Sequence, residues 1–159
     1  MNVLDWAAAL EASALGEWMR SSALAYPIAN VVHLLGLVLL LGPILLLDLR
    51  LLGAGQTFPL SPVSRVLTTW AIAGLLLLVG AGFLLFAADA RPLLGNPIMQ
   101  LKLCGIALGL INAVAFRFLW RDHLNTWDVR APWLGRAQVG ASIAIWLAVA
   151  TLGRWIAYS

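Results

Sequence analysis

Three polar side chains near the N-terminus lie within one apolar stretch, at spacings that place them on one side of a helix. Tyr26, Asn30 and His33 follow the pattern i, i+4, i+7, and residues three or four positions apart are neighbours on a helix surface. A neutral imidazole is a standard ligand of haem iron. Gly36 continues the same face and would leave room beside the ring. The pattern predicts either a haem site with His33 as axial ligand or a packed, hydrogen-bonded histidine without a cofactor.

A second group of candidates lies in the last two apolar stretches. Lys102 is followed by Gly105 and Gly109 on the same helix face, and Arg154 lies near the C-terminus. A deprotonated Lys102 could be a second iron ligand; otherwise Lys102 or Arg154 would pair with a haem propionate or another carboxylate. The two glycines would admit the flat ring. The alternative is structural: both cations reach lipid headgroups, and the glycines allow close helix packing.

The elements that must position these residues are membrane-spanning helices. Apolar residues make up 62% of the 159-residue chain and charged residues only 11%, against about 25% charged in a typical soluble domain. About 20 apolar residues of helix cross the hydrocarbon core of a bilayer, and the alternating pattern of a membrane barrel is missing. We therefore predict an all-α, up-down transmembrane four-helix bundle forming a single domain over residues 1–159. The predicted spans cover residues 23–47, 66–88, 98–119 and 134–158.

The segment before the first span is apolar but carries acids and tryptophans. Residues 2–19 are too short and too charged to cross a bilayer, which predicts an interfacial helix lying on the bundle. They also lack the basic start of a cleavable signal peptide, so we expect the segment to remain in the mature protein.

The arginines predict the orientation of the bundle. More of them lie in the first and third links between spans than on the opposite side, and cytoplasmic loops carry the excess of basic residues. This predicts a multi-pass protein of the cell inner membrane with both termini in the periplasm. The arginine-rich links hold Arg50, Arg65, Arg117, Arg121, Arg130 and Arg136; the other side holds Arg20, Arg91 and Arg154.

Several classes of function lack the residues they need. The net charge of +3 comes with one lysine and no basic run, which excludes a nucleic-acid surface. The sequence has no HExxH motif, paired cysteines or carboxylate cluster for zinc or iron. It has no GxSxG elbow and no phosphate-binding glycine loop. A two-haem cytochrome needs four intramembrane histidines, and His33 stands alone within the predicted spans.

Residues 26–36 (YPIANVVHLLG), together with residues 48–53 (DLRLLG) and 153–158 (GRWIAY), resemble a family of uncharacterised bacterial four-helix membrane proteins. That resemblance covers the whole chain. More distantly, the plan is similar to the four-helix membrane protoporphyrinogen oxidases that bind haem b. Those proteins have a histidine before a glycine in the first helix and a lysine in the third, which His33 and Lys102 match. The similarity implies haem b binding, although Asn112 lies where that family has a further histidine.

Two functions follow from these patterns. The first is a haem-b-binding electron carrier or small oxidoreductase with Tyr26 and Asn30 as donors around His33. The alternative is a non-catalytic membrane subunit or scaffold, in which His33, Asn30 and Lys102 form a buried polar network that helps to dock a periplasmic or membrane protein. A second copy of the chain is a further candidate partner. Transport ranks third, because the polar groups lie mainly in one half of the bundle.

Overall fold

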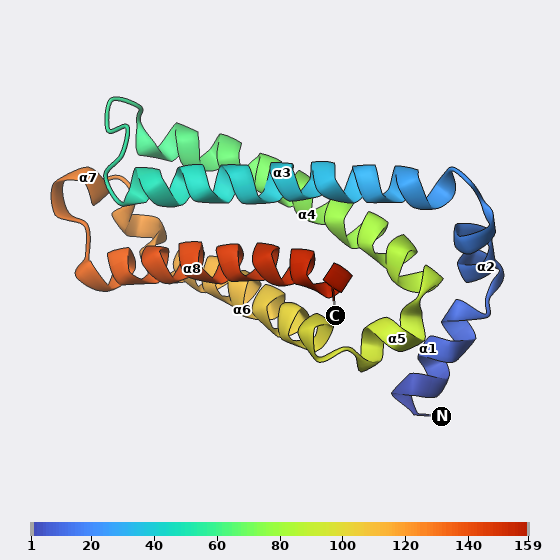
Figure 1. The fold of residues 1–159 in the computed structure, drawn as a ribbon. Helices are drawn as coiled ribbons and strands as arrows, with labels where there is room; N and C mark the ends of the chain where they lie inside the picture. The colour runs from blue at the N-terminus through green and yellow to red at the C-terminus, as the bar shows by residue number, and fades with distance from the viewer. Residues whose placement is uncertain (1, 159) are drawn as a thin grey trace.

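The computed structural model describes residues 2–158, and in this part of the chain every regular element is a helix (Figure 1). The elements in order are α1 (Val3–Glu11), α2 (Ala14–Ser21), α3 (Ala25–Leu51), α4 (Leu60–Ala88), α5 (Ala90–Gly95), α6 (Pro97–Trp120), η1 (Arg121–His123), α7 (Trp127–Arg130), α8 (Trp133–Trp155) and η2 (Ile156–Tyr158).

The four long helices α3, α4, α6 and α8 are long and apolar enough to cross a membrane. This confirms the predicted all-α four-helix architecture. Two of the helices are longer than predicted, since α3 runs on to Leu51 and α4 begins at Leu60. Both of these end residues are buried, so the helices continue past the apolar stretch into a packed end. Pro62 then falls in the first turn of α4, where proline is tolerated.

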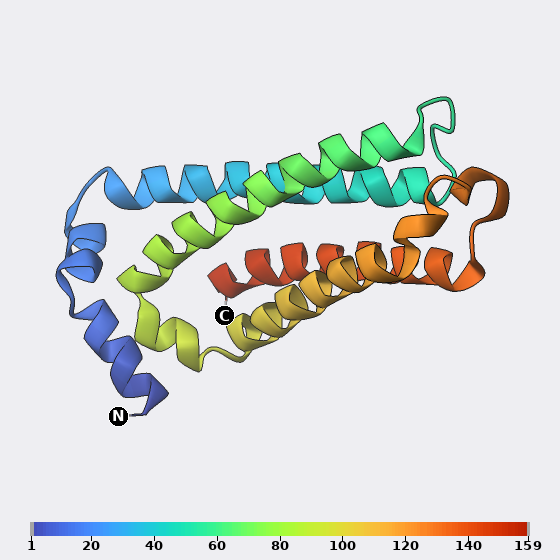
Figure 2. The ribbon, with the colours of Figure 1, turned by 180° about the vertical axis from the view of Figure 1, so that it is seen from behind.

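The long helices form two hairpins that lie side by side (Figure 1, Figure 2). Helix α3 packs closely on α4, α6 packs on α8, and the hairpins meet mainly where α3 contacts α8. Gly36 and Gly74 mark the crossing of α3 and α4. A Cβ at Gly74 would lie 2.8 Å from the carbonyl oxygen of Gly36, so only glycine lets the two backbones approach this closely.

The two ends of the bundle differ. The α3–α4 loop, η1 and α7 lie together at one end, here called the arginine-rich end, and α1, α2 and α5 lie at the opposite end (Figure 1). A buried cluster of Leu51, Leu60, Trp127 and Val139 holds the arginine-rich end together. Trp127 also makes edge contacts with two neighbouring aromatic rings. The short helix α7 was not predicted, and it delivers this tryptophan to the cluster.

The predicted single helix over residues 2–19 is wrong, because the segment forms two helices, α1 and α2. Asn2 and Asp5 cap α1 reciprocally. Ser13 breaks the segment, since its hydroxyl accepts a hydrogen bond from the Gly16 backbone N–H and starts α2. Arg20 then donates to the carbonyl oxygens of Ala88 at 2.8 Å and Glu11 at 2.8 Å. This arginine ties both short helices to the end of α4.

Candidate functional site

His33 packs against α4 at a position where a glycine leaves room for its ring. A Cβ at Gly82 would lie 3.1 Å from Cε1 and 3.3 Å from Nδ1 of His33. The Nδ1 atom is buried without a hydrogen-bond partner among the described residues, although the backbone of Leu78 lies beside the ring. A buried polar atom without a partner costs about 1–3 kcal/mol. The ring is therefore held in place by packing and keeps unused hydrogen-bonding capacity.

Lys102 lies in the same half of the bundle but belongs to the other hairpin. Its side chain extends along α8, where a Cβ at Gly153 would lie 3.3 Å from Nζ and 3.4 Å from Cε. The structure thus places His33 and Lys102 in the same half of the bundle, His33 against α4 and Lys102 against α8. Their part in binding a cofactor stays a prediction.

Tyr26 and Asn30 do not join His33 as predicted. Both side chains are exposed, and within residues 2–158 no hydrogen bond connects either of them to His33. The reason is the face that α3 turns toward the protein: Ala25 and Ala29 are buried on that face. Tyr26 directly follows Ala25 and Asn30 directly follows Ala29, and one residue corresponds to a turn of about 100° around the helix. The helical spacing was right, but it did not say which side of α3 would be buried.

Gly36, Gly105 and Gly109 were predicted to leave room for a haem ring, but all three have protein atoms beside them. A Cβ at Gly36 would lie 2.9 Å from the backbone nitrogen of Leu78, at the α3–α4 crossing. A Cβ at Gly105 would lie 2.7 Å from Cγ2 of Val149, and a Cβ at Gly109 would lie 2.9 Å from Cζ2 of Trp146. These glycines therefore pack helices together, which was the structural alternative. A role in admitting a flat ring has no support from their packing.

Arg154 is exposed and stacks on the last tyrosine of the chain. Its guanidinium carbon lies 4.8 Å from the centre of the Tyr158 ring, and Nη2 donates a hydrogen bond to the Tyr158 hydroxyl. Among the described residues no carboxylate forms an ion pair with Arg154. The structure thus gives no support to a carboxylate of the protein as the partner of Arg154, and pairing with a carboxylate of a ligand stays a prediction.

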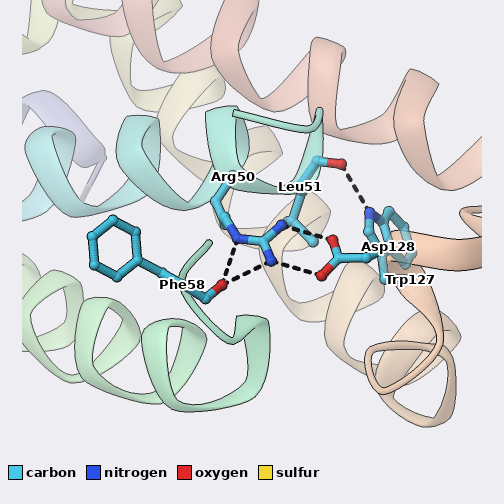
Figure 3. Close-up of polar contacts among 5 residues, drawn as sticks. All are labelled: Arg50, Leu51, Phe58, Trp127 and Asp128. Atoms are coloured by element: carbon cyan, nitrogen blue, oxygen red, sulfur yellow. Dashed lines mark hydrogen bonds and ion pairs between the residues drawn. The ribbon is translucent and has the colours of Figure 1, made fainter. Parts of the chain in front are cut away.

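Arg50 takes part in the most extensive polar arrangement in the described chain, shown in Figure 3. Its guanidinium donates to both carboxylate oxygens of Asp128 at 2.7 Å and twice to the carbonyl oxygen of Phe58, at 3.0 and 2.8 Å. Nearby, Nε1 of Trp127 donates to the carbonyl oxygen of Leu51 at 2.8 Å. These bonds join the α3–α4 loop to α7.

The hydrogen bonds from Arg50, together with its positive charge, lower the pKa of Asp128, and partial burial of the carboxyl opposes this only in part. The side chain of Arg50 is 5% exposed and that of Asp128 is 40% exposed. The pair is therefore half-buried, with water at the carboxylate and protein around the guanidinium. Two parallel N–H···O bonds to one carboxylate fix both the distance and the plane of the pair.

Asp48 is a candidate site residue that was not predicted. Its side chain is buried, and its Oδ2 has no hydrogen-bond partner among the described residues. Ser142 of α8 lies beside it, and one turn further on, Nε1 of Trp146 is also buried without a partner. The signal was present in the sequence, because an acid within a spanning helix marks a candidate functional site, and Ser142 and Trp146 are spaced i, i+4.

These three residues line a chamber of about 430 Å³ between the two hairpins, toward the arginine-rich end. Its walls are mostly apolar and come from α3, α4, α6 and α8. Small-molecule sites in proteins have volumes of about 300–1,000 Å³, so the chamber is large enough to hold a ligand. Neither His33 nor Lys102 lines it. The molecule thus has two separate regions of interest, one around each end.

No curated protein and no solved structure matches this chain. The sequence matches the family of unknown function DUF6644 over residues 4–159, and because this match covers nearly the whole chain, the protein belongs to that family.

Proposed function

We propose that this protein binds haem b in the membrane, with His33 as the axial ligand of the iron. The observation that carries the proposal is the packing of His33, whose Nδ1 is buried beside the Leu78 backbone while no side chain in residues 2–158 hydrogen-bonds the ring. The Nδ1 and Cε1 atoms of the ring lie against Gly82, and Nε2 is the nitrogen that would bind the iron. Ligating histidines commonly hold one ring nitrogen against a backbone carbonyl while the other binds the metal.

A single histidine is sufficient for this role. Within residues 2–158 no three His, Cys, Asp or Glu side chains are grouped closely enough to hold a free metal ion. Haem differs from a free ion because the porphyrin supplies four nitrogen ligands, and the protein supplies only one or two axial ligands.

Lys102 would complete the site from the second hairpin. Lys102 near the start of α6 and His33 near the start of α3 lie in the same half of the bundle, so the Lys102 side chain would extend toward a group bound at His33. Deprotonated, its amine would be the second axial ligand; protonated, it would pair with a propionate. Arg154, exposed and free of carboxylates in the described chain, is a second candidate for a propionate. Bound haem supplies one-electron transfer, which makes an electron carrier or a small oxidoreductase the proposed activity.

The test uses absorption spectra of the detergent-purified protein, oxidised and then reduced, from cells supplied with a haem precursor. We expect a Soret band that shifts on reduction and is lost in His33→Ala. His123→Ala is the matched control, because His123 is exposed in η1 at the arginine-rich end. A well-folded wild-type protein with a flat visible spectrum contradicts the proposal. The proposal is also contradicted if His33→Ala and His123→Ala lose the Soret band to the same extent.

The role of Lys102 is read from the same spectra. Lys102→Met removes the amine and the charge while keeping a similar length. If the amine is an axial ligand, the reduced bands shift and an added small ligand binds to the vacated position. If Lys102 pairs with a propionate, the bands keep their positions and haem is released more readily. Unchanged spectra and unchanged haem retention would remove Lys102 from the site.

A scaffold that docks a periplasmic or membrane protein is the second candidate function. The observation that favours it is the exposure of Trp6 and Trp18 on α1 and α2, with exposed fractions of 45% and 53%. Tryptophan is enriched both in protein interfaces and at membrane surfaces. Crosslinking from position 18 separates the two uses: adducts with a defined protein, or with a second copy of this chain, support docking, and adducts with lipid alone contradict it.

We also propose that both termini face the periplasm and that the arginine-rich end faces the cytoplasm of a cell with an inner membrane. The support is the bias of arginines toward the α3–α4 and α6–α8 links. Alkaline phosphatase fused to the C-terminus is active only outside the cytoplasm. We expect an active fusion at residue 159 and an inactive one in the loop at residue 55; the reverse result contradicts this orientation.

A further inference from the structure

Three arginines converge on one polar cavity at the arginine-rich end. Arg65 from the first turns of α4, Arg117 from the end of α6 and Arg121 from η1 line a cavity of about 640 Å³. Serine, threonine and asparagine side chains complete much of its wall, and Asp122 is the one carboxylate lining it. Within residues 2–158 the ion pair is Arg50–Asp128, so none of the three arginines is paired with a carboxylate. Arg117 donates instead to the Thr68 hydroxyl at 2.8 Å.

The polar cavity adjoins the apolar chamber of about 430 Å³ described above. Ser64, Thr68, Arg117 and Arg121 line both spaces. Beyond them most of the chamber wall is aliphatic, with side chains such as Leu40, Ile44 and Leu75, and the buried Asp48 and Ser142 lie within it. The combined space therefore has a positive, hydrogen-bonding mouth and an apolar interior.

The chamber also opens sideways. Val114 and Phe118 of α6 line it and are themselves 55% and 85% exposed on the surface of the bundle. This surface belongs to a helix long and apolar enough to cross a membrane, so hydrocarbon chains lie against it. Residues that line the chamber therefore also face the acyl chains of the bilayer.

We infer that this combined space binds an anionic phospholipid, with its phosphate at Arg65, Arg117 and Arg121 and an acyl chain in the chamber. The planar guanidinium of arginine matches the oxygens of a phosphate with two parallel hydrogen bonds. The three positive charges against one negative charge favour an anionic over a zwitterionic headgroup. A free phosphate would bind only at the arginines of the polar cavity and would leave the apolar chamber empty. A phospholipid would fill both spaces, which is why we favour a lipid as the ligand.

The competing explanation is that these arginines touch bulk headgroups, as basic residues at the ends of spanning helices commonly do. The chain offers a matched control for this explanation. Arg130 and Arg136 lie at the same end and are exposed, but neither lines the mouth or the chamber. A specific site depends on the arginines of the mouth and not on this second pair, although removing either pair changes the net charge equally.

The experiment titrates detergent-purified protein with phosphatidylglycerol and with phosphatidylcholine of the same acyl chains, followed by native mass spectrometry. Wild-type protein should bind phosphatidylglycerol saturably and more tightly than phosphatidylcholine. Arg117→Gln/Arg121→Gln should lower the phosphatidylglycerol affinity about tenfold, the effect of losing about 1.4 kcal/mol. Arg130→Gln/Arg136→Gln should leave that affinity within about twofold of wild type.

A further variant and a further ligand test the chamber. Ala71→Trp fills the chamber wall, so it should weaken phosphatidylglycerol binding and leave the binding of inorganic phosphate unchanged. The inference is overturned if the two arginine pairs have equal effects or if the two lipids bind equally. It is also overturned if inorganic phosphate displaces the lipid and binds as tightly, because the site is then an anion site without a lipid component. The lipid comparison uses the wild-type protein, so it decides the question even if a variant does not fold.

Discussion

The Arg50–Asp128 pair provides the sharpest quantitative prediction of the fold. Asp128→Asn keeps the shape of the side chain and removes the charge that accepts two hydrogen bonds of 2.7 Å. A hydrogen bond to a charged group contributes about 1.5–3 kcal/mol when buried, and an exposed ion pair about 0–1 kcal/mol. Because the guanidinium is 5% exposed and the carboxylate 40% exposed, we expect an intermediate loss of about 2 kcal/mol. In a chain of this size that lowers Tm by about 4–8 °C.

The assay is thermal unfolding in detergent micelles followed by tryptophan fluorescence, for Asp128→Asn, Arg50→Gln and the double variant. The coupling energy from this cycle isolates the pair, and we expect about 1–2 kcal/mol. Asp122→Asn is the matched control, because Asp122 is exposed in η1 and forms no ion pair within residues 2–158. A coupling energy near zero, or an equal effect of Asp122→Asn, would refute the claim that this pair holds the arginine-rich end together.

The pair also predicts a dependence on pH. Arg50 lowers the pKa of Asp128 below its unfolded value, which is about 3.9. The stabilisation is therefore complete above that value and is lost as the pH falls through the lower, folded pKa. The difference in Tm between wild type and Asp128→Asn should be constant from about pH 5 upward and should shrink below about pH 4. A difference that persists unchanged at the lowest accessible pH would contradict this assignment.

Three further variants test the packing and the buried polar groups. Gly74→Ala should destabilise the bundle by about 1–3 kcal/mol. Gly80→Ala is the control and should be neutral or stabilising, because no atom lies within 4 Å of its Cβ position. Equal effects of the two substitutions on Tm would contradict the close α3–α4 crossing. Trp127→Phe should cost about 1–2 kcal/mol in thermal unfolding, because it removes the bond to the Leu51 carbonyl oxygen; an unchanged Tm would contradict this. Asp48→Asn should raise Tm by a few degrees, since the buried carboxylate has an oxygen without a partner; a lower Tm would show that the carboxylate stabilises the fold.

The membrane helices were predictable because their signal is strong and local. A stretch of about 20 apolar residues has few stable alternatives to a spanning helix. The match to a family of unknown function also agrees with the resemblance to uncharacterised membrane proteins noted from the sequence. Helix ends were less predictable, because tertiary contacts set them: Leu51 and Leu60 are helical where buried packing continues beyond the apolar stretch. Ser13 could have revealed the break between α1 and α2, since serine is a preferred residue at a helix start.

The candidate site was predictable only in part. Spacing placed Tyr26 and Asn30 beside His33, but spacing cannot tell which face of an apolar helix meets the protein and which meets lipid. The pairing of Arg50 with Asp128, 78 positions apart, carries no local sequence signal at all. Asp48 was different, because an acid within a spanning helix is visible in the sequence and by itself marks a candidate site.

The absorption spectrum of the purified protein tests the central claim most directly, because it detects haem without assuming an activity. The account predicts a Soret band that shifts on reduction, is retained in His123→Ala and is absent in a folded His33→Ala variant. A wild-type protein that is folded, prepared from cells with ample haem precursor and still colourless would contradict haem binding. The buried imidazole beside Gly82 would then be a structural element of a bundle that binds partners or lipids.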